Sequence, residues 1–343
     1  MRILLCSVPF RPSTGGVETV SALLADAFHS LGHEVIVVTQ TPANEPDEAP
    51  YPVLRRPSPL ALLRAVRQAD IVLHNNISLR LAWPLLLQPR PWVIAHHMWI
   101  PRFGPGAVAG RLKHFASRFA DNIAVSTAMA ASLSVDSTVI PNPYADDVFR
   151  ADLPPAPKSD LVFLGRLIPD KGLDVLLDSL SLLKARSIRP TLTIIGRGSD
   201  EERARARVSA LALDSQVRFA GLLRSRALAV ALCSHRVLVV PSTWEEPFGV
   251  VALEGMACGL VPIVARSGGL PDAVGACGLV VEKSDAGALA SAIERLLSDE
   301  ALIRTFRAAA PAHLGQHTRE RIAHRYLSVL VRAVELHYGA AHA

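Results

Sequence analysis

Two glutamates eight positions apart stand out in the stretch PSTWEEPFGVVALEGMACGLVPIVA, residues 241 to 265. The sequence predicts a helix from about Gly249 to Gly259, since glycine commonly follows the last turn of a helix. Glu246 then precedes the helix, beside backbone N–H groups that the helix itself leaves without partners. Glu254 lies about five residues into the helix, roughly 7 to 8 Å along its axis, among aliphatic side chains.

A carboxylate on an apolar helix loses solvation unless it gains a partner. Ribose hydroxyls would satisfy Glu254, and sugar hydroxyls with backbone amides would satisfy Glu246. The alternative is a carboxylate at a helix start plus an internal salt bridge, because acidic residues favour helix N-termini. Glu245 is expected to be simply exposed. The spacing of the pair, between PFG and ACG, favours a sugar-nucleotide site.

The stretch GRLIPDKG, residues 165 to 172, places Arg166 and Lys171 five positions apart across a turn at the end of a strand. A diphosphate leaving group needs two such cations if no metal neutralises it. The sequence contains no D-x-D and no His/Cys cluster at ligand spacing, so we expect no metal and no cofactor. Taken alone, the two cations are better explained as solvated loop charges, because most surface cations serve only solubility.

Two nucleotide motifs fail when they are tested. After TLTII comes Gly196-Arg197-Gly198, but Glu201 stands where a dinucleotide fingerprint has its third glycine. GRLIPDKG has the lysine of a phosphate loop but lacks the preceding glycine and the following hydroxyl. Neither NAD nor a P-loop triphosphate is favoured.

Short apolar strands alternate with amphipathic helices along the whole chain, which indicates parallel α/β sheets. The alternation pauses at RADLPPAPKSD, residues 150 to 160, a proline-rich connector, and then restarts. We therefore expect two doubly wound, Rossmann-like domains facing across a cleft. The first covers residues 1–157 and the second 158–317, and a final helix, 318–343, is expected to pack back on the first domain.

Composition narrows the setting. The 343 residues contain no apolar run of about 18 residues, and the opening segment lacks a cleavage site of small residues. A cytoplasmic protein is expected, with its four scattered cysteines acting as small buried hydrophobic residues. The net charge of +5 suits an anionic ligand or membrane surface. No nucleic-acid module is recognised, and aromatic residues for base stacking are few.

The run EPFGVVALEGMACGLVPIVARSGGLPD resembles the E-x7-E signature of retaining glycosyltransferase family 4, whose members have the two-domain GT-B fold. The resemblance extends to GGVE at residues 15–18, VIPNPYADDVF at 139–149, LGRLIPDKGLDVLL at 164–177 and IIGRGSD at 194–200. Two departures lie in loops: Pro143 and Pro247 replace glycines that are usual in the family.

The resemblance implies a role for each matching residue. Arg166 and Lys171 would hold the donor diphosphate, and Glu254 would bind the nucleotide ribose. The N-terminal loop would lie near the phosphate and the acceptor. The remaining donor-site residues implied are Gly15, Gly16, Gly196, Glu246, Phe248, Gly249 and Val250, with Glu246 and the amides of residues 248–250 on the transferred sugar.

Members of this family also carry a histidine after a strand in the middle of the first domain, and WVIAHHMW offers His96 and His97. A histidine at a strand's carboxyl end can hydrogen-bond a sugar hydroxyl or polarise the acceptor. Because strand residues alternate in direction, one of the two is expected to be a core histidine. Alignment of the motif slightly favours His97, and a shift of one residue reverses the choice.

The predicted reaction moves a sugar from a nucleoside diphosphate sugar to an acceptor hydroxyl with retention of anomeric configuration. A nucleotide-sugar epimerase of the same fold and a non-catalytic sugar-nucleotide binding protein are the alternatives. The acceptor, a glycan or a lipid-linked molecule, cannot be specified. GAVAGRLKHFASRFAD, residues 106–121, fits an interfacial helix for peripheral contact with the inner face of the cell membrane, and equally a surface helix.

Overall fold

The computed structural model describes residues 1–13, 15–43, 47–151 and 159–339, which form two compact units. The first unit comprises Met1–Pro143 together with the C-terminal segment from Thr318, and the second comprises Tyr144–His317. Tyr144 and Phe149 are both buried within the second unit. The division therefore falls before the proline-rich connector, and the expected boundary at residue 157 lies outside the described residues.

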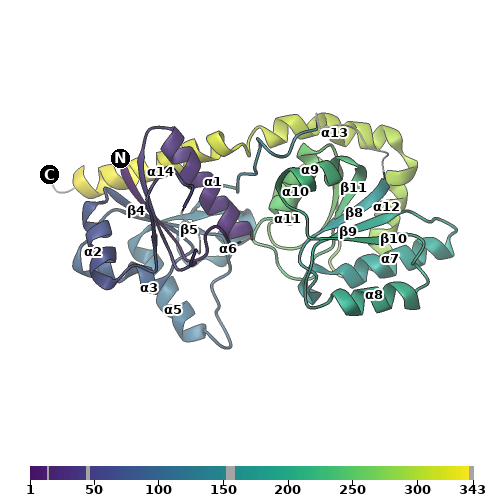
Figure 1. Cartoon of the computed structure of the whole chain (residues 1–343), viewed down its shortest axis with the longest axis horizontal. Coiled ribbons are helices and arrows are strands. Elements are labelled where there is room, and N and C mark those ends of the chain that lie inside the picture. The colour runs from purple at the N-terminus through teal and green to yellow at the C-terminus, as the bar shows by residue number, and fades with distance from the viewer. Residues whose placement is uncertain (14, 44–46, 152–158, 340–343) are drawn as a thin grey trace. The chain divides into compact units, whose positions relative to one another are not determined.

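The first unit is a parallel sheet covered by helices (Figure 1). Its seven strands have the order β3-β2-β1-β4-β5-β6-β7. The strands are β1 (Arg2–Ser7), β2 (Glu34–Thr39), β3 (Val53–Arg55), β4 (Ile71–Asn75), β5 (Trp92–His96), β6 (Asp121–Ala124) and β7 (Thr138–Val139). The helices are α1 (Gly16–Ser30), α2 (Pro59–Gln68), α3 (Leu79–Ala82), α4 (Pro84–Leu87), α5 (Ala107–Ala116), the 3-10 turn η1 (Ser117–Phe119), α6 (Thr127–Ser132) and α14 (Arg319–Gly339).

The second unit repeats the same design with six parallel strands in the order β10-β9-β8-β11-β12-β13. The strands are β8 (Ser159–Leu164), β9 (Leu192–Ile195), β10 (Val217–Gly221), β11 (His235–Val240), β12 (Val261–Ala265) and β13 (Leu279–Val281). The helices are the 3-10 turn η2 (Pro169–Lys171), α7 (Leu173–Ala185), α8 (Glu201–Ala210), α9 (Ser225–Cys233), α10 (Val250–Ala257), α11 (Leu270–Val274), α12 (Ala286–Ser298) and α13 (Glu300–Leu314).

Both sheets reverse their strand order at one point, between β1 and β4 in the first unit and between β8 and β11 in the second. The strands read as continuous apolar runs because helices cover both faces of a doubly wound sheet. In the second unit, Phe163, Val239 and Ile263 belong to one core with Leu176 of α7 and Ile293 of α12. The two expected doubly wound domains are confirmed. Ligands of such sheets bind at the carboxyl ends of the strands beside the reversal point.

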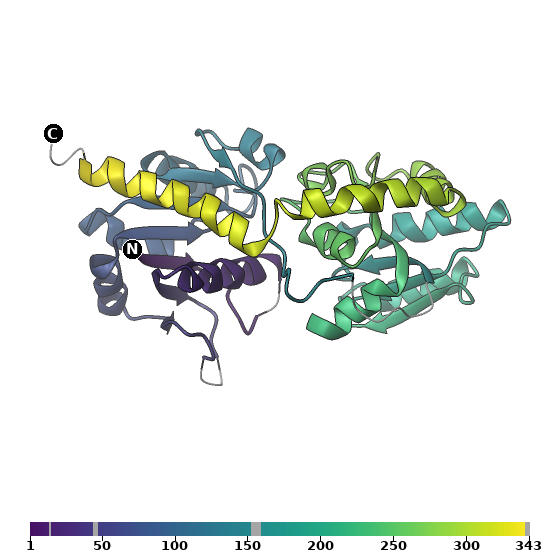
Figure 2. The ribbon, with the colours of Figure 1, turned by 90° about the horizontal axis from the view of Figure 1, so that it is seen from above.

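The C-terminal helix α14 lies on the first unit, where it packs beside α1 and against β4 and β5 (Figure 2). Tyr326 is fully buried there, with its ring centroid 6.5 Å from that of Phe28 on α1. Helix α14 thus completes a layer that begins about 300 residues earlier in the chain, at α1. None of the helices among the described residues combines the length and the hydropathy that a membrane crossing requires.

Candidate active site

Lys171 and Glu246 meet at the reversal point of the second sheet. Lys171 ends the turn η2 that follows β8, and Glu246 lies in the loop that follows the neighbouring strand β11. The Lys171 Nζ donates to Glu246 Oε1 at 2.5 Å, and the hydroxyl of Ser242 donates to the same oxygen at 2.7 Å. The fold thus joins a predicted phosphate-binding cation to a predicted sugar-binding carboxylate 75 positions away.

The close approach of these two loops depends on a glycine. Gly172 has a φ of 69°, and a Cβ there would lie 1.9 Å from the carbonyl oxygen of Pro241. Thr243 and Trp244 complete the junction by donating their backbone N–H groups to the carbonyl of Asp170. Any side chain at position 172 would separate the loops, so Gly172 fixes the position of Lys171 relative to β11.

Arg166 lies on the same edge of the sheet, two positions after the last residue of β8. It is exposed, and within the described residues no hydrogen bond or ion pair reaches its guanidinium group. An exposed guanidinium group suits an oxyanion such as a diphosphate. Gly196 follows β9, and its backbone passes so close to Gly165 that a Cβ would lie 1.8 Å from the Gly165 carbonyl oxygen.

Glu254 occupies the middle of α10, and the remainder of that helix is apolar or glycine. Its side chain keeps a small exposed surface, but so many protein atoms surround the carboxylate that burial raises its pKa to about 7. Within the described residues no hydrogen bond or ion pair to the carboxylate is found, so the internal salt bridge of the alternative interpretation is absent there. A buried acid without a partner is a destabilising feature that a bound hydroxyl would relieve.

The loop before α10 is firmly held. Phe248 is buried with its ring 5.7 Å from that of His317, and Gly249 starts the helix with a φ of 114°. The carbonyl of Glu246 accepts the N–H of Gly269 at 2.7 Å. Val250 is the first residue of α10, where backbone N–H groups have no partner within the helix and favour an anionic or hydroxyl oxygen.

Glu245 is exposed, as the sequence predicted, but its carboxylate also makes contacts that the sequence did not predict. One of its oxygens accepts the backbone N–H of Gly268 at 2.5 Å, and the other pairs with Lys283. The Lys283 ammonium group is the main cause that holds the pKa of Glu245 below its usual value. Glu245 therefore braces the loop that carries Glu246. No local pattern in the sequence indicated this, because Glu245, Gly268 and Lys283 lie in separate segments.

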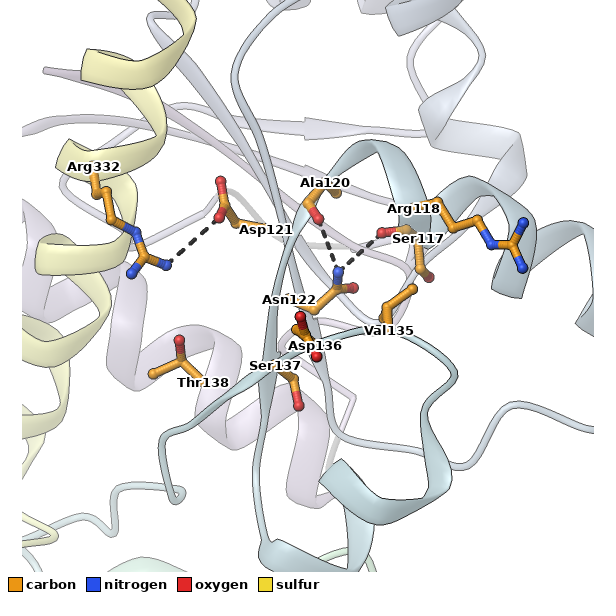
Figure 3. Close-up of a pocket in the computed structure, with 10 residues that line it drawn as sticks. All are labelled: Ser117, Arg118, Ala120, Asp121, Asn122, Val135, Asp136, Ser137, Thr138 and Arg332. Carbon is orange, nitrogen blue, oxygen red and sulfur yellow. Dashed lines mark hydrogen bonds and ion pairs between the residues drawn. The ribbon is translucent and has the colours of Figure 1, made fainter.

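The two histidines of the first unit have different surroundings. His96 ends β5 and is buried, with Nε2 2.9 Å from the side-chain oxygen of Asn122. Asn122 in turn donates to the carbonyls of Ser117 and Ala120 (Figure 3). Burial lowers the pKa of His96 to about 4. His96 is thus enclosed in a satisfied network, as a core histidine is.

His97 follows β5 directly and is also buried, and burial lowers its pKa to about 4. Neither ring nitrogen makes a hydrogen bond of normal geometry within the described residues. The Asn142 side chain nevertheless lies near enough to oppose part of the shift. At neutral pH the ring therefore offers one donor and one acceptor. These surroundings favour His97 as the ligand-binding member of the pair.

The glycines of the first unit lie where a ligand loop was expected. Gly15 is the residue before α1, and Gly16 is the first residue of that helix. They follow β1, one of the two strands beside the reversal point of the first sheet. The residue between Ser13 and Gly15 lies outside the described part of the chain.

A separate hollow of about 530 Å³ lies at the opposite edge of the first sheet (Figure 3). Asp121 and Thr138, the first residues of β6 and β7, line it together with Arg332 of α14. Arg332 lies 3.6 Å from the Asp121 carboxylate. The hollow is therefore distant from the carboxyl ends of the strands and is not part of the candidate site. Among the described residues, no group of three or more acidic, histidine or cysteine side chains could hold a metal ion.

Comparison with solved structures defines the class of fold. The chain aligns over 96% of its length with 98% of a sucrose-phosphate synthase from Thermosynechococcus elongatus, with a TM-score of 0.79 and 24% identity. It also aligns over 97% of its length with all of the Anabaena protein HepE in complex with UDP, with a TM-score of 0.81 and 20% identity. The two parallel α/β units are those of the GT-B fold.

Sequence comparison identifies the family. The profile of glycosyltransferase family 4 matches residues 14–147, and that of the glycosyl transferases group 1 matches residues 146–313. This chain belongs to glycosyltransferase family 4, as the sequence motifs predicted.

Among named relatives, a D-inositol 3-phosphate glycosyltransferase of Jonesia denitrificans is 37% identical over 193 residues, 53% of this chain and 45% of that protein. A 2-deoxystreptamine N-acetyl-D-glucosaminyltransferase of Streptomyces fradiae is 31% identical over 240 residues, 66% of this chain and 57% of that protein. The matches thus span about half the length of these curated relatives.

Proposed function

We propose that this protein transfers a sugar from a nucleoside diphosphate sugar to an acceptor hydroxyl with retention of anomeric configuration. The observation that carries the proposal is the cluster at the reversal point of the second sheet. There Arg166 and Lys171 follow β8, Glu246 and Glu254 follow the neighbouring strand β11, and Lys171 pairs with Glu246. The family membership and the names of the relatives support the same activity.

In the proposed reaction, the bond between the anomeric carbon and the diphosphate oxygen breaks, and the diphosphate keeps the electron pair. Arg166 and Lys171 stabilise the charge that develops there, without a metal ion. The acceptor oxygen bonds to the anomeric carbon on the same face, and its proton passes to the departing diphosphate oxygen. Glu254 binds the ribose, while Glu246 and the amides of residues 248–250 bind the transferred sugar.

His97 completes the assignment in the first unit. Its ring is neutral at pH 7 because burial holds its pKa near 4, so it can donate to one oxygen and accept from another. A hydroxyl of the sugar or of the acceptor would satisfy a buried ring nitrogen that has no hydrogen bond of normal geometry within the described residues.

Relatives guide the choice of substrates to test. Solved neighbours are described in complex with UDP or UDP-glucose, and one relative is named a GDP-mannose-dependent mannosyltransferase. Their named acceptors are an inositol phosphate, a phosphatidylinositol monomannoside and a 2-deoxystreptamine. A thermal-shift screen of UDP and GDP sugars should reveal the donor, since a ligand at 100 times its Kd adds about 2.7 kcal/mol. We propose a polyhydroxylated glycan or lipid-linked acceptor.

Product analysis with a donor labelled in its sugar tests the function directly. Transfer of the label to an added polyol or glycolipid supports the proposal. An epimerised donor would instead show an epimerase, and an unchanged donor that still stabilises the protein would show a binding protein.

Peripheral contact with a membrane is a second part of the proposal, and it rests on α5 and η1. Val108, Leu112, Phe115 and Phe119 recur at helical spacing and are between 52% and 69% exposed. The buried residues of this segment are Gly110 and Ser117, so the apolar stripe faces away from its unit.

Basic side chains adjoin this stripe. Arg102, Arg111, His114 and Arg118 line a hollow of about 440 Å³ next to Phe115. Exposed aromatic residues beside cations fit the boundary of an anionic bilayer, where rings enter the apolar layer and cations meet phosphate.

Sedimentation with vesicles tests this contact. Vesicles of phosphatidylcholine with phosphatidylglycerol should retain the protein at low salt and release it at high salt. Replacing Phe115 and Phe119 by serine should abolish retention. Leu86→Ser is the matched control, because Leu86 is 86% exposed on α4 of the same unit. Absence of retention at every salt concentration would leave α5 as ordinary surface.

A further inference from the structure

The backbone at the end of β5 is held by one side chain. The Oδ1 atom of Asn76 accepts the backbone N–H of His97 at 2.7 Å and that of Met98 at 2.9 Å. His97 and Met98 lie beyond the last residue of β5. The side chain of Asn76 therefore supplies the hydrogen bonds that a neighbouring strand would supply if the sheet continued.

The backbone of Asn76 explains why a side chain has to do this. Its N–H donates to the carbonyl of Ala95 at 2.8 Å, which is the last bond between β4 and β5. The residue then turns away with a φ of 65°, a left-handed conformation that asparagine tolerates better than most residues. β4 leaves the sheet at this point, and the amide oxygen extends its pairing with β5.

The groups held in this way are unsatisfied. The Nδ2 of Asn76 and both ring nitrogens of His97 are buried without a hydrogen bond of normal geometry within the described residues. Buried polar groups without partners are rare and costly in folded proteins. Their presence together at the carboxyl edge of a doubly wound sheet points to a ligand that supplies the missing partners.

We propose that Asn76 is a positioning residue for His97, which it holds through the two backbone hydrogen bonds so that the imidazole meets a ligand hydroxyl in a fixed orientation. The proposal rests on the function proposed above for His97. It assigns a role to a residue that the sequence did not single out, although the HNN at the end of a strand was visible.

A neutral asparagine suits this role at position 76 better than a charged aspartate would. Aspartate would also accept both N–H groups and tolerate the left-handed conformation. A carboxylate beside the buried His97 would, however, favour the protonated ring and remove its acceptor nitrogen. Asparagine keeps the two backbone bonds and leaves the imidazole neutral, at the cost of one buried donor.

Histidine side-chain NMR on the full-length protein tests the proposal without any substrate. The probe is the ring Cε1–H signal of selectively labelled histidine, assigned with His96→Gln and His97→Gln. In Asn76→Gly, which keeps the left-handed turn but loses the amide, the His97 signal should shift or broaden. In Asn76→Asp it should sharpen again and titrate above the wild-type pKa of about 4.

Asn122→Ala is the matched control, because Asn122 is the amide bound to the neighbouring His96. It should move the His96 signal and leave that of His97 in place. The proposal is overturned if Asn76→Gly leaves the His97 signal at its wild-type position, or if Asn76→Asp fails to restore it. Nucleoside diphosphate binding by the second unit, measured by thermal shift, separates this outcome from a failure of the proposed function.

Discussion

Replacing Glu254 by glutamine should stabilise the ligand-free protein above pH 7 and weaken its nucleotide binding. The carboxylate lies on an apolar helix, and within the described residues no hydrogen bond to it is found. Its pKa is about 7 against an ordinary value of 4.5, because burial penalises the charged form. If the charge serves a ligand and not the fold, removing it should raise the free energy of unfolding of the ligand-free protein.

The magnitude follows from the pKa. The folded protein keeps the proton over a range where the unfolded chain has lost it, so the free energy of unfolding falls as the pH rises from 4.5 to 7. The difference between these pKa values corresponds to about 3 kcal/mol. The buried glutamine amide is itself left without hydrogen bonds, which costs roughly 1 to 2 kcal/mol and reduces the stabilisation by that amount. The net stabilisation is about 1 to 2 kcal/mol at pH 8. Near pH 5 the relieved penalty is only about 1 kcal/mol, so the net effect there is zero or slightly destabilising.

Thermal unfolding at pH 5 and pH 8, with and without UDP or GDP, measures both effects. At roughly 2 to 4 °C per kcal/mol for a unit of this size, Glu254→Gln should raise the Tm at pH 8 by several degrees. Loss of one charged hydrogen bond should weaken nucleotide binding by about 1.5 to 3 kcal/mol, roughly 10- to 150-fold.

Glu245→Gln provides the control of opposite sign, because its pKa is lowered by Lys283 and its charge stabilises the fold at pH 8. A Glu254→Gln variant that is less stable than wild type at pH 8 would refute the reasoning about the unpartnered carboxylate. Unchanged nucleotide binding would refute the assignment to ribose.

Three further outcomes are expected. Glu246→Gln should lower kcat by roughly 10- to 150-fold without weakening nucleoside diphosphate binding, since contacts to the reacting sugar strengthen in the transition state. Steady-state kinetics with calorimetry measures both. Activity in excess EDTA should equal that in magnesium, and loss restored by a divalent ion would contradict the role of Arg166. His97→Ala should lower transfer without changing nucleoside diphosphate affinity, and an equal loss in both would place His97 elsewhere.

The sequence predicted the two doubly wound units because each strand and helix is a local apolar pattern. The glycines Gly32 and Gly259 marked helix ends, and both have the positive φ that such positions require. The order of the strands in the sheet could not be predicted from local patterns, since the pairing of β8 with β11 joins segments separated by three helices. The meeting of Lys171 with Glu246 depends on that order and was therefore not predicted.

The side-chain contacts of Glu245, Glu246 and His96 could not be predicted from the sequence either. The contacts of Glu245 were not predicted because Lys283 and Gly268 lie far along the chain, and no local pattern indicated the bond from Ser242 to Glu246. The choice between His96 and His97 needed the position of Asn122 on the next strand. Each of these contacts depends on the tertiary structure, about which local sequence pattern carries little information.

The Lys171–Glu246 pair gives the proposed donor site a means of distinguishing its substrate from its product. In the free protein each charge satisfies the other at 2.5 Å. A nucleoside diphosphate that drew Lys171 away would leave Glu246 partly buried with only Ser242 as a partner, which costs free energy. A nucleoside diphosphate sugar brings phosphate oxygens for Lys171 and hydroxyls for Glu246, so both partners are replaced at once. On this reasoning the pair favours the intact donor over the diphosphate that remains after transfer.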